Sequence, residues 1–167
     1  MSDAVTVLAE QIRKAFEDNP RLARQALVYP DTWETEDLLR NLAKVGDVPN
    51  DSFVEWHSSS LPVFTAEGLR DVLPHYMTYS LRHPRSDAAE YLIFHLSPAE
   101  TNDDYWPRRL AVFSGAQRQV VCAFLKHLEH ELSGEHYDSH FARALVVWGC
   151  SEPRSAVKPR GGPDPAV

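Results

Sequence analysis

The stretch that decides the fold reads SGAQRQVVCAFLKHLEHELSG and spans residues 114–134. Its large apolar residues recur at spacings of three and four, which is typical of one buried helix face: Val121, Phe124, Leu125, Leu128 and Leu132. Ser114 and Gln117 match a capping box at the start, and Gly134 is the residue type that commonly follows a helix end. We therefore expect a helix over residues 115–132.

Similar apolar spacing continues on both sides of this stretch. It predicts helices over residues 3–18, 31–46, 65–82, 86–96 and 137–148, with further turns near 21–28 and 53–57. Pro74 is expected to kink the helix over residues 65–82, to split it, or to open a new helix at that point. Residues 91–95 are short enough to form a strand instead, and residues 97–113 are predicted to be a polar loop.

Length and composition predict one compact all-α domain of about six or seven helices over residues 1–150. The chain has 167 residues, of which 43% are hydrophobic, as in ordinary globular proteins. Residues 151–167 hold four prolines and two adjacent glycines, so we expect a disordered tail there. Cys122 and Cys150 form no C-x-x-C pair and are predicted to be reduced.

The formal net charge of −7 narrows the classes of partner. It argues against nucleic acid and against an anionic membrane surface, because both are bound through clustered Lys and Arg. It fits a basic protein partner, which an acidic surface attracts. The first residues lack the basic and apolar regions of a signal peptide, and no apolar run approaches a membrane span. We expect a cytoplasmic protein without a cofactor.

Acidic and aromatic residues alternate between residues 31 and 57. We call seven of them the acidic–aromatic face: Trp33, Glu34, Glu36, Asp37, Asp51, Glu55 and Trp56. Aromatic side chains within a charged surface are typical of protein interfaces, because they offer large and rigid contact areas. The favoured interpretation is nevertheless that the tryptophans fill the core beneath a solvated acidic loop, as large aromatic residues often do.

Four of the eight histidines lie in one short stretch and raise the question of a metal site: His127, His130, His136 and His140. Imidazole and carboxylate groups are good ligands for zinc or iron. The written pattern, His-Leu-Glu-His-Glu, matches neither H-E-x-x-H nor H-x-x-E-H. His130 is expected opposite the apolar helix face and His127 at its flank, so a solvated surface is the favoured interpretation. No catalytic residue is predicted.

Four segments of the chain resemble a family. They are Tyr29-Pro30, LPHYMTYSL at residues 73–81, LIFHLSP at 92–98, and FSGAQRQVVCAFLKHL at 113–128. They look like a family of uncharacterised bacterial all-helical proteins with an LPxYL-type helix followed by an LTxxQxxxVxxFL helix. The likeness spans roughly residues 28–132, and Phe113-Ser114-Gly115 stands where the family tends to have Leu-Thr. The resemblance implies a helical fold and carries no activity.

Two classes of function follow from these observations. The favoured one is a non-enzymatic protein-binding module, in its sharpest form an immunity or inhibitor protein that caps a basic toxin or enzyme. The alternative is a metal-binding protein or metal-dependent hydrolase that uses the cluster from His127 to His140. A third possibility is an accessory domain whose partner occupies a groove near Pro74, where a helix break would free backbone groups.

Overall fold

The computed structural model describes residues 3–30, 33–98 and 105–150, and over these ranges the chain is helical. The elements are α1 (Asp3–Phe16), α2 (Arg24–Leu27), α3 (Trp33–Lys44), α4 (Asp51–Trp56), a 3₁₀ turn (Leu61–Val63), α5 (Ala66–Arg82), α6 (Asp87–Leu96), α7 (Tyr105–Ala111), α8 (Gly115–Glu131) and α9 (Asp138–Val147). The all-α class is confirmed. Within these ranges there are nine α-helices, more than the six or seven expected, because α2 and α4 are short separate helices and α7 was predicted as loop.

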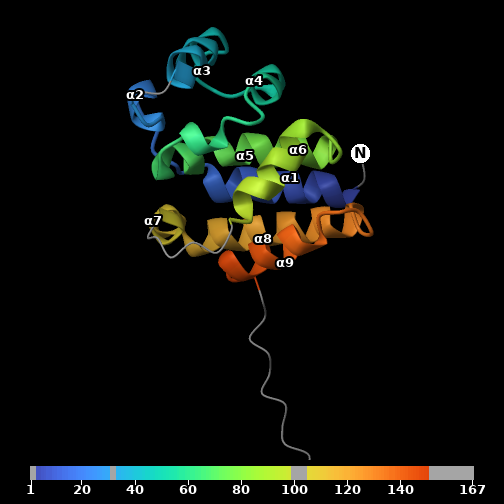
Figure 1. The fold of residues 1–167 in the computed structure, drawn as a ribbon. Coiled ribbons are helices and arrows are strands. Elements are labelled where there is room, and N and C mark those ends of the chain that lie inside the picture. Colours follow the sequence, from blue (N-terminus) through green and yellow to red (C-terminus); the bar gives the residue numbers. More distant parts are fainter. Residues whose placement is uncertain (1–2, 31–32, 99–104, 151–167) are drawn as a thin grey trace, which may run out of the picture.

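Helix α5 is the centre of the structure. It contacts α1, α2, α4, α6, α7 and α8, and α8 in turn packs against α1 and α9. Figure 1 shows α2, α3 and α4 together on one side of α5, while α8 and α9 lie on the opposite side. The helices that carry most of the acidic–aromatic face therefore form an outer layer of the molecule.

The capping signals in the sequence are confirmed. Ser114 Oγ accepts a hydrogen bond from the Gln117 backbone N–H at 3.2 Å, and Gln117 Oε1 accepts one from the Ser114 N–H at 3.0 Å. Thr65 and Ser86 cap α5 and α6 with one bond each, because their hydroxyl oxygens accept from the backbone N–H of Gly68 and Ala89. All five apolar residues predicted for the face of α8 and its end are buried. Gly134 has a φ of +83°, the left-handed conformation that suits glycine after a helix.

The helix over residues 66–82 continues through Pro74, so the predicted split and the predicted new helix are wrong. Proline lacks the N–H that would reach the Arg70 carbonyl. That carbonyl instead accepts a hydrogen bond from Asn19 Nδ2 at 3.1 Å, and Asn19 Oδ1 accepts one from Gln117 Nε2 at 2.8 Å. The capping glutamine of α8 thus supports the proline site of α5 through the end of α1, and the Arg70 carbonyl is not left open for a partner.

Helix α2 docks against the first turn of α5 through a close backbone approach. A Cβ atom on Gly68 would lie 1.9 Å from the Leu27 carbonyl oxygen, so only glycine fits there. The Thr65 hydroxyl donates to the Ala26 carbonyl at 2.9 Å, and an isolated β-bridge joins Val28 to Phe64. These contacts hold the outer layer at a fixed place on α5.

The two cysteines form a disulfide, so the prediction that both are reduced is wrong. Helix α9 returns along α8 and brings the Cα atoms of Cys122 and Cys150 to 5.2 Å, although 28 positions separate them in sequence. A linear pattern does not show that return. Disulfides persist mainly in oxidising compartments, so this pair favours such a compartment, while the cytoplasmic location stays a prediction.

Two further loop-or-strand expectations are resolved by the structure. Residues 91–95 belong to helix α6, and Tyr105–Ala111 form helix α7 inside the stretch predicted as a loop. The expected cap at Asp31 or Thr32 and the expected tail at 151–167 lie outside the described residues. Among the helices of the described ranges, none is both long enough and apolar enough to cross a membrane.

Candidate protein-binding face

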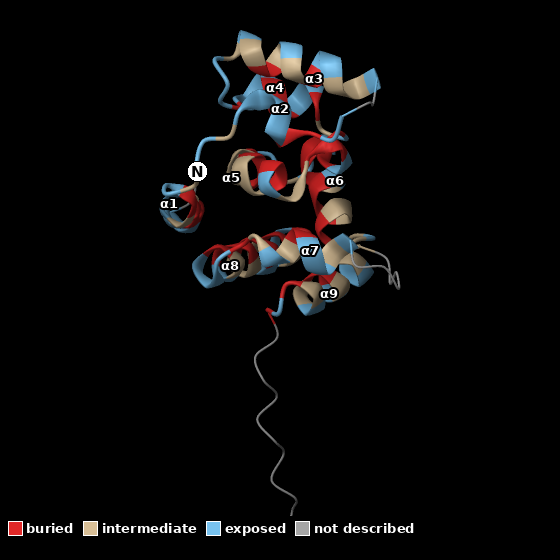
Figure 2. Ribbon diagram, turned by 90° about the vertical axis from the view of Figure 1, so that its left-hand side faces the viewer, coloured by how far each residue is buried: buried red, intermediate tan, exposed pale blue. Residues whose placement is uncertain are grey.

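The two tryptophans of the acidic–aromatic face point into solvent. Trp33, the first residue of α3, is 83% exposed, and Trp56, the last residue of α4, is 62% exposed. The interpretation that they fill the core is therefore wrong. Phe53 of α4 is the aromatic residue that fills the core, and it is fully buried. Helix α4 has only six residues, so only one of its sides packs on α5. In Figure 2 both α3 and α4 carry a few buried residues among exposed or intermediate ones.

Asp51 and Glu55 face α5 and are structural. Both Asp51 carboxylate oxygens accept hydrogen bonds from the Arg82 guanidinium at 2.7 Å, which lowers the pKa of Asp51. Glu55 Oε1 accepts a hydrogen bond from the Tyr79 hydroxyl at 2.8 Å. Burial and the Glu55 carboxylate raise the pKa of Tyr79 to about 12, so this hydroxyl stays a donor at neutral pH. These two acids help to hold α4 on α5, so we exclude them from the candidate interface.

The carboxylates of α3 are differently placed. Asp37 pairs with Arg40 on the same helix at 2.6 Å, but both side chains are 60% exposed, and such surface pairs add little stability. Glu34 and Glu36 form no ion pair with any residue of the described ranges. The first turns of α3 therefore carry negative charges that form few contacts within the described part of the fold.

His57 links the α3 acids to the end of α4. Its Nε2 lies 3.1 Å from Asn41 Nδ2 on α3, and its ring packs on Phe53 with centroids 4.8 Å apart. Burial lowers the pKa of His57, while the charges of Asp37 and Glu34 act in the opposite direction. Glu34 and Asp37 are thus electrostatic neighbours of the residue that follows Trp56. We use the name Trp33–Trp56 face for five residues of α3 and α4: Trp33, Glu34, Glu36, Asp37 and Trp56.

The four clustered histidines do not converge. His140 Nδ1 lies 2.9 Å from the Ser97 hydroxyl, His136 lies 3.7 Å from Glu90, and His130 is exposed. Burial is the main cause that lowers the pKa of His140. In the ranges that the structure describes, no three His, Cys, Asp or Glu side chains are grouped to hold a metal ion. The metal alternative on His127, His130, His136 and His140 gains no support from this arrangement.

Sequence reasoning missed a buried cation on α7. Arg109 is only 1% exposed, and its Nη1 donates to the Phe64 carbonyl at 2.9 Å. Its guanidinium carbon lies 4.9 Å from the ring centre of Tyr105, and its Nη2 lies 3.4 Å from His95 Nε2. Burial and the Arg109 charge lower the pKa of His95 to about 3, so the imidazole is neutral beside the cation. The spacing of Tyr105 and Arg109 was the available signal, since residues four apart meet on a helix.

The comparisons with known proteins leave the activity open. No curated protein and no solved structure matches the chain. A family model described as "Family of unknown function (DUF6714)" matches residues 5–149, which is nearly all of the described domain. The expected resemblance to an uncharacterised family is therefore confirmed, and the chain belongs to the DUF6714 family of unknown function.

Proposed function

We propose that this protein is a non-enzymatic protein-binding module whose Trp33–Trp56 face receives a basic protein. The observation that carries the proposal is the exposure of both tryptophans, 83% and 62%, beside carboxylates that form few contacts within the described fold. Exposed tryptophan is a common anchor of protein interfaces, where it fills a pocket of the partner and excludes water. Leaving two such rings in water has no benefit to folding.

The charge around these rings selects the sign of the partner. Glu34, Glu36 and Asp37 occupy the first turns of α3, and Arg40 is the only cation that pairs with them in the described ranges. The whole chain carries a net charge of −7, so its field attracts a basic protein at long range. Complementary charge mainly speeds association and selects partners, while the tryptophans supply contact area.

The finer form of the proposal is an immunity or inhibitor protein that caps a basic toxin or enzyme. An inhibitor of this kind needs a small rigid surface with rigid anchors and opposite charge, and needs no catalytic group of its own. Helix α4, which carries Trp56, is anchored by buried Phe53 and Val54 and also contacts α5 through Asp51–Arg82 and Glu55–Tyr79. Such a preorganised face loses little conformational entropy on binding.

Affinity capture from the source organism tests the proposal in a quantitative form. The bait is the full chain, and it is compared with a Trp33→Ala/Trp56→Ala variant and with a Val7→Ala/Val146→Ala variant. Val7 and Val146 are exposed apolar residues on α1 and α9, helices that pack mainly on α5, α6 and α8 rather than on α3 or α4. We expect one stoichiometric basic partner that the first variant loses and the control variant retains, with affinity that falls as salt rises.

Charge reversal then tests the finer form. The variant Glu34→Lys/Glu36→Lys/Asp37→Lys is expected to slow association with the captured partner by tenfold or more and to abolish protection in cells that express that partner. A basic partner that binds the Trp33→Ala/Trp56→Ala variant as tightly as the wild type would contradict the proposed face. A partner that binds through the face but is not inhibited would remove the inhibitor role and leave the binding role.

A further inference from the structure

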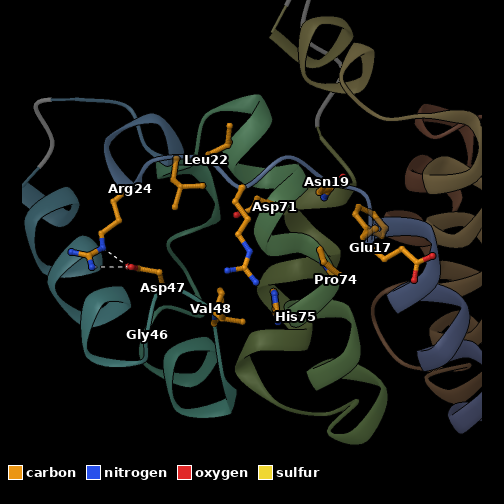
Figure 3. A pocket seen from close by; sticks show the side chains of 14 residues that line it. Glu17, Asn19, Leu22, Arg24, Gly46, Asp47, Val48, Asp71, Pro74 and His75 are labelled. Carbon is orange, nitrogen blue, oxygen red and sulfur yellow. Dashed lines mark hydrogen bonds and ion pairs between the residues drawn. The ribbon is translucent and has the colours of Figure 1, made fainter.

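A cavity of about 240 Å³ lies beside Pro74, where α5 faces α2 and the loop between α3 and α4 (Figure 3). At about 30 Å³ per water in the liquid, it has room for about eight waters, roughly the number of non-hydrogen atoms in a small metabolite. Its walls come from the end of α1, the linker to α2, residues 46–49 and α5. It is a separate site from the Trp33–Trp56 face, and none of the residues of that face lines it.

One wall of the cavity is held by an ion pair. Arg24 of α2 binds both carboxylate oxygens of Asp47, with Nη2 and Oδ2 2.9 Å apart. The Asp47 backbone has a φ of +66°, which residues other than glycine rarely adopt, and its N–H donates to the Leu42 carbonyl at 3.0 Å. Figure 3 shows this pair at one side of the cavity. The two charges neutralise each other and fix the loop as a wall.

Three polar residues line the cavity without a hydrogen bond or ion pair to a described residue: Arg21, Asp71 and His75. Arg21 is exposed, while Asp71 and His75 are partly buried. Asp71 and His75 lie one turn apart on α5, and in Figure 3 they extend toward the same space as Leu22 and Val48. Burial raises the pKa of Asp71 and lowers that of His75. The charges of Arg70 and Arg21 offset part of this cost for Asp71, but no described residue forms a hydrogen bond with either group.

These groups define the ligand that would suit them. The Asp71 carboxylate calls for a cationic donor, the Arg21 guanidinium calls for a carboxylate, and a neutral His75 can donate or accept one hydrogen bond. The Arg24–Asp47 pair is internally balanced, and Glu17, a third acid of the lining, pairs with Arg13 at 3.4 Å. Arg21 and Asp71 therefore leave one further charge of each sign at the cavity. A zwitterion satisfies both, whereas a simple anion or cation satisfies one and meets like charge at the other.

The remaining walls are apolar, with Leu22, Val48 and Pro49 among them. We propose that this cavity binds a free α-amino acid with an aliphatic side chain. Its ammonium group pairs with Asp71, its carboxylate with Arg21, and its side chain packs against Val48 and Pro49. His75 then hydrogen-bonds to the same polar end.

The probe for this proposal is L-leucine, titrated into the full chain by isothermal calorimetry. Two analogues that each lack one charged group serve as matched ligands: isopentylamine without the carboxylate, and isocaproate without the ammonium group. We expect leucine to bind with at least tenfold higher affinity than either analogue, since each charge-assisted hydrogen bond contributes a factor of this size.

Variants locate the binding in the cavity. Asp71→Asn and Arg21→Gln are each expected to weaken leucine binding at least tenfold. Glu67→Gln changes an exposed acid one turn earlier on α5, outside the cavity, and is expected to leave the affinity unchanged. Circular dichroism confirms that each variant is folded before it is titrated.

Several outcomes would overturn the proposal: no leucine binding at millimolar concentration, equal affinity for leucine and either analogue, or equal loss in Glu67→Gln and Asp71→Asn. The Trp33→Ala/Trp56→Ala variant is expected to bind leucine normally. The cavity and the proposed protein-binding face can therefore fail independently.

Discussion

In two parts of this molecule the usual burial is reversed: tryptophans are exposed in one, and an arginine is buried in the other. At the α3–α4 edge, Trp33 and Trp56 are 83% and 62% exposed. At the α6–α7 edge, Arg109 is 1% exposed and lies beside His95. In each case the neighbours decide the burial. Phe53 and Val54 form the buried side of α4, so its tryptophan faces outward. The Phe64 carbonyl and the Tyr105 ring contact the Arg109 guanidinium inside the fold.

The difference indicates which edge serves folding and which is free for other work. Arg109 gives up its hydration for a hydrogen bond and an aromatic contact, so the fold depends on it. Trp33 makes no comparable contribution to a core, and the fold has little use for its ring. Exposed apolar residues that do not stabilise the fold are candidates for recognition.

The largest effect is expected from Phe53, the buried aromatic residue of α4. Phe53→Ala should lower the free energy of unfolding by about 3–5 kcal/mol, because it leaves a cavity in the core. Trp56→Ala, three positions along the same helix, should change it by less than about 1 kcal/mol. Urea unfolding followed by far-ultraviolet circular dichroism measures both. Similar losses of unfolding free energy in the two variants would contradict the assignment of Phe53 to the core and Trp56 to the surface.

The next effect concerns the buried cation. Arg109→Ala should lower the free energy of unfolding by about 3 kcal/mol, because it removes packing and leaves the buried Phe64 carbonyl without its donor. Arg109→Met keeps most of the volume and removes a buried charge, so its loss should be smaller. If Met is as harmful as Ala, the guanidinium itself stabilises the α6–α7 edge.

Acid should weaken the α6–α7 edge through His95. The folded chain keeps this imidazole neutral down to a pKa of about 3, whereas the unfolded chain takes up the proton near pH 6.5. Between those values the unfolded state binds more protons, so stability is complete above pH 6.5 and falls as the pH falls. From pH 6.5 to pH 5 the loss is at most about 2 kcal/mol.

Urea midpoints at several pH values measure this dependence. His95→Gln should flatten the decline, and His130→Gln, which changes an exposed residue of α8, should not. A decline that is the same in the wild type and in His95→Gln would place the acid sensitivity at other buried histidines.

The smallest effect on stability is expected at Trp33. Trp33→Phe should leave the free energy of unfolding within about 0.5 kcal/mol of the wild type, as is usual for exposed sites. It should nevertheless remove a large share of the fluorescence that acrylamide quenches, because Trp148 is buried and Trp106 is partly buried. Unchanged quenching would contradict the exposure on which the protein-binding face rests.

The predictable part of this fold consists of signals that lie within a few residues of each other. The Ser114–Gln117 cap and the apolar face of α8 can be predicted from the sequence, because both depend on spacings of three and four. The same local signals place the acids of α3 at a helix start. Local spacing does not predict which side of α4 meets α5, because that contact joins residues distant in sequence.

The unpredicted features all depend on residues that are distant in sequence. Pro74 stays within α5 because the Arg70 carbonyl accepts a hydrogen bond from Asn19. Asn19 and Arg70 are 51 positions apart in the sequence. Arg109 is drawn into the fold by the carbonyl of Phe64, 45 positions away, so α7 forms in a stretch with proline and charge. The orientation of α4 depends in the same way on its contacts with α5, among them Asp51 with Arg82 and Glu55 with Tyr79. Only the assembled helices bring these partners together.

The disulfide between Cys122 and Cys150 also determines how the domain would carry a mechanical load. A pull on the residues that follow Cys150 passes through the sulfur bridge into the middle of α8. Helix α9 lies within the covalent loop that the bridge closes, so it is off the path of that force and cannot be peeled away first. The domain would yield at the contact between α8 and α1, and reduction of the bridge would move the point of failure to α9.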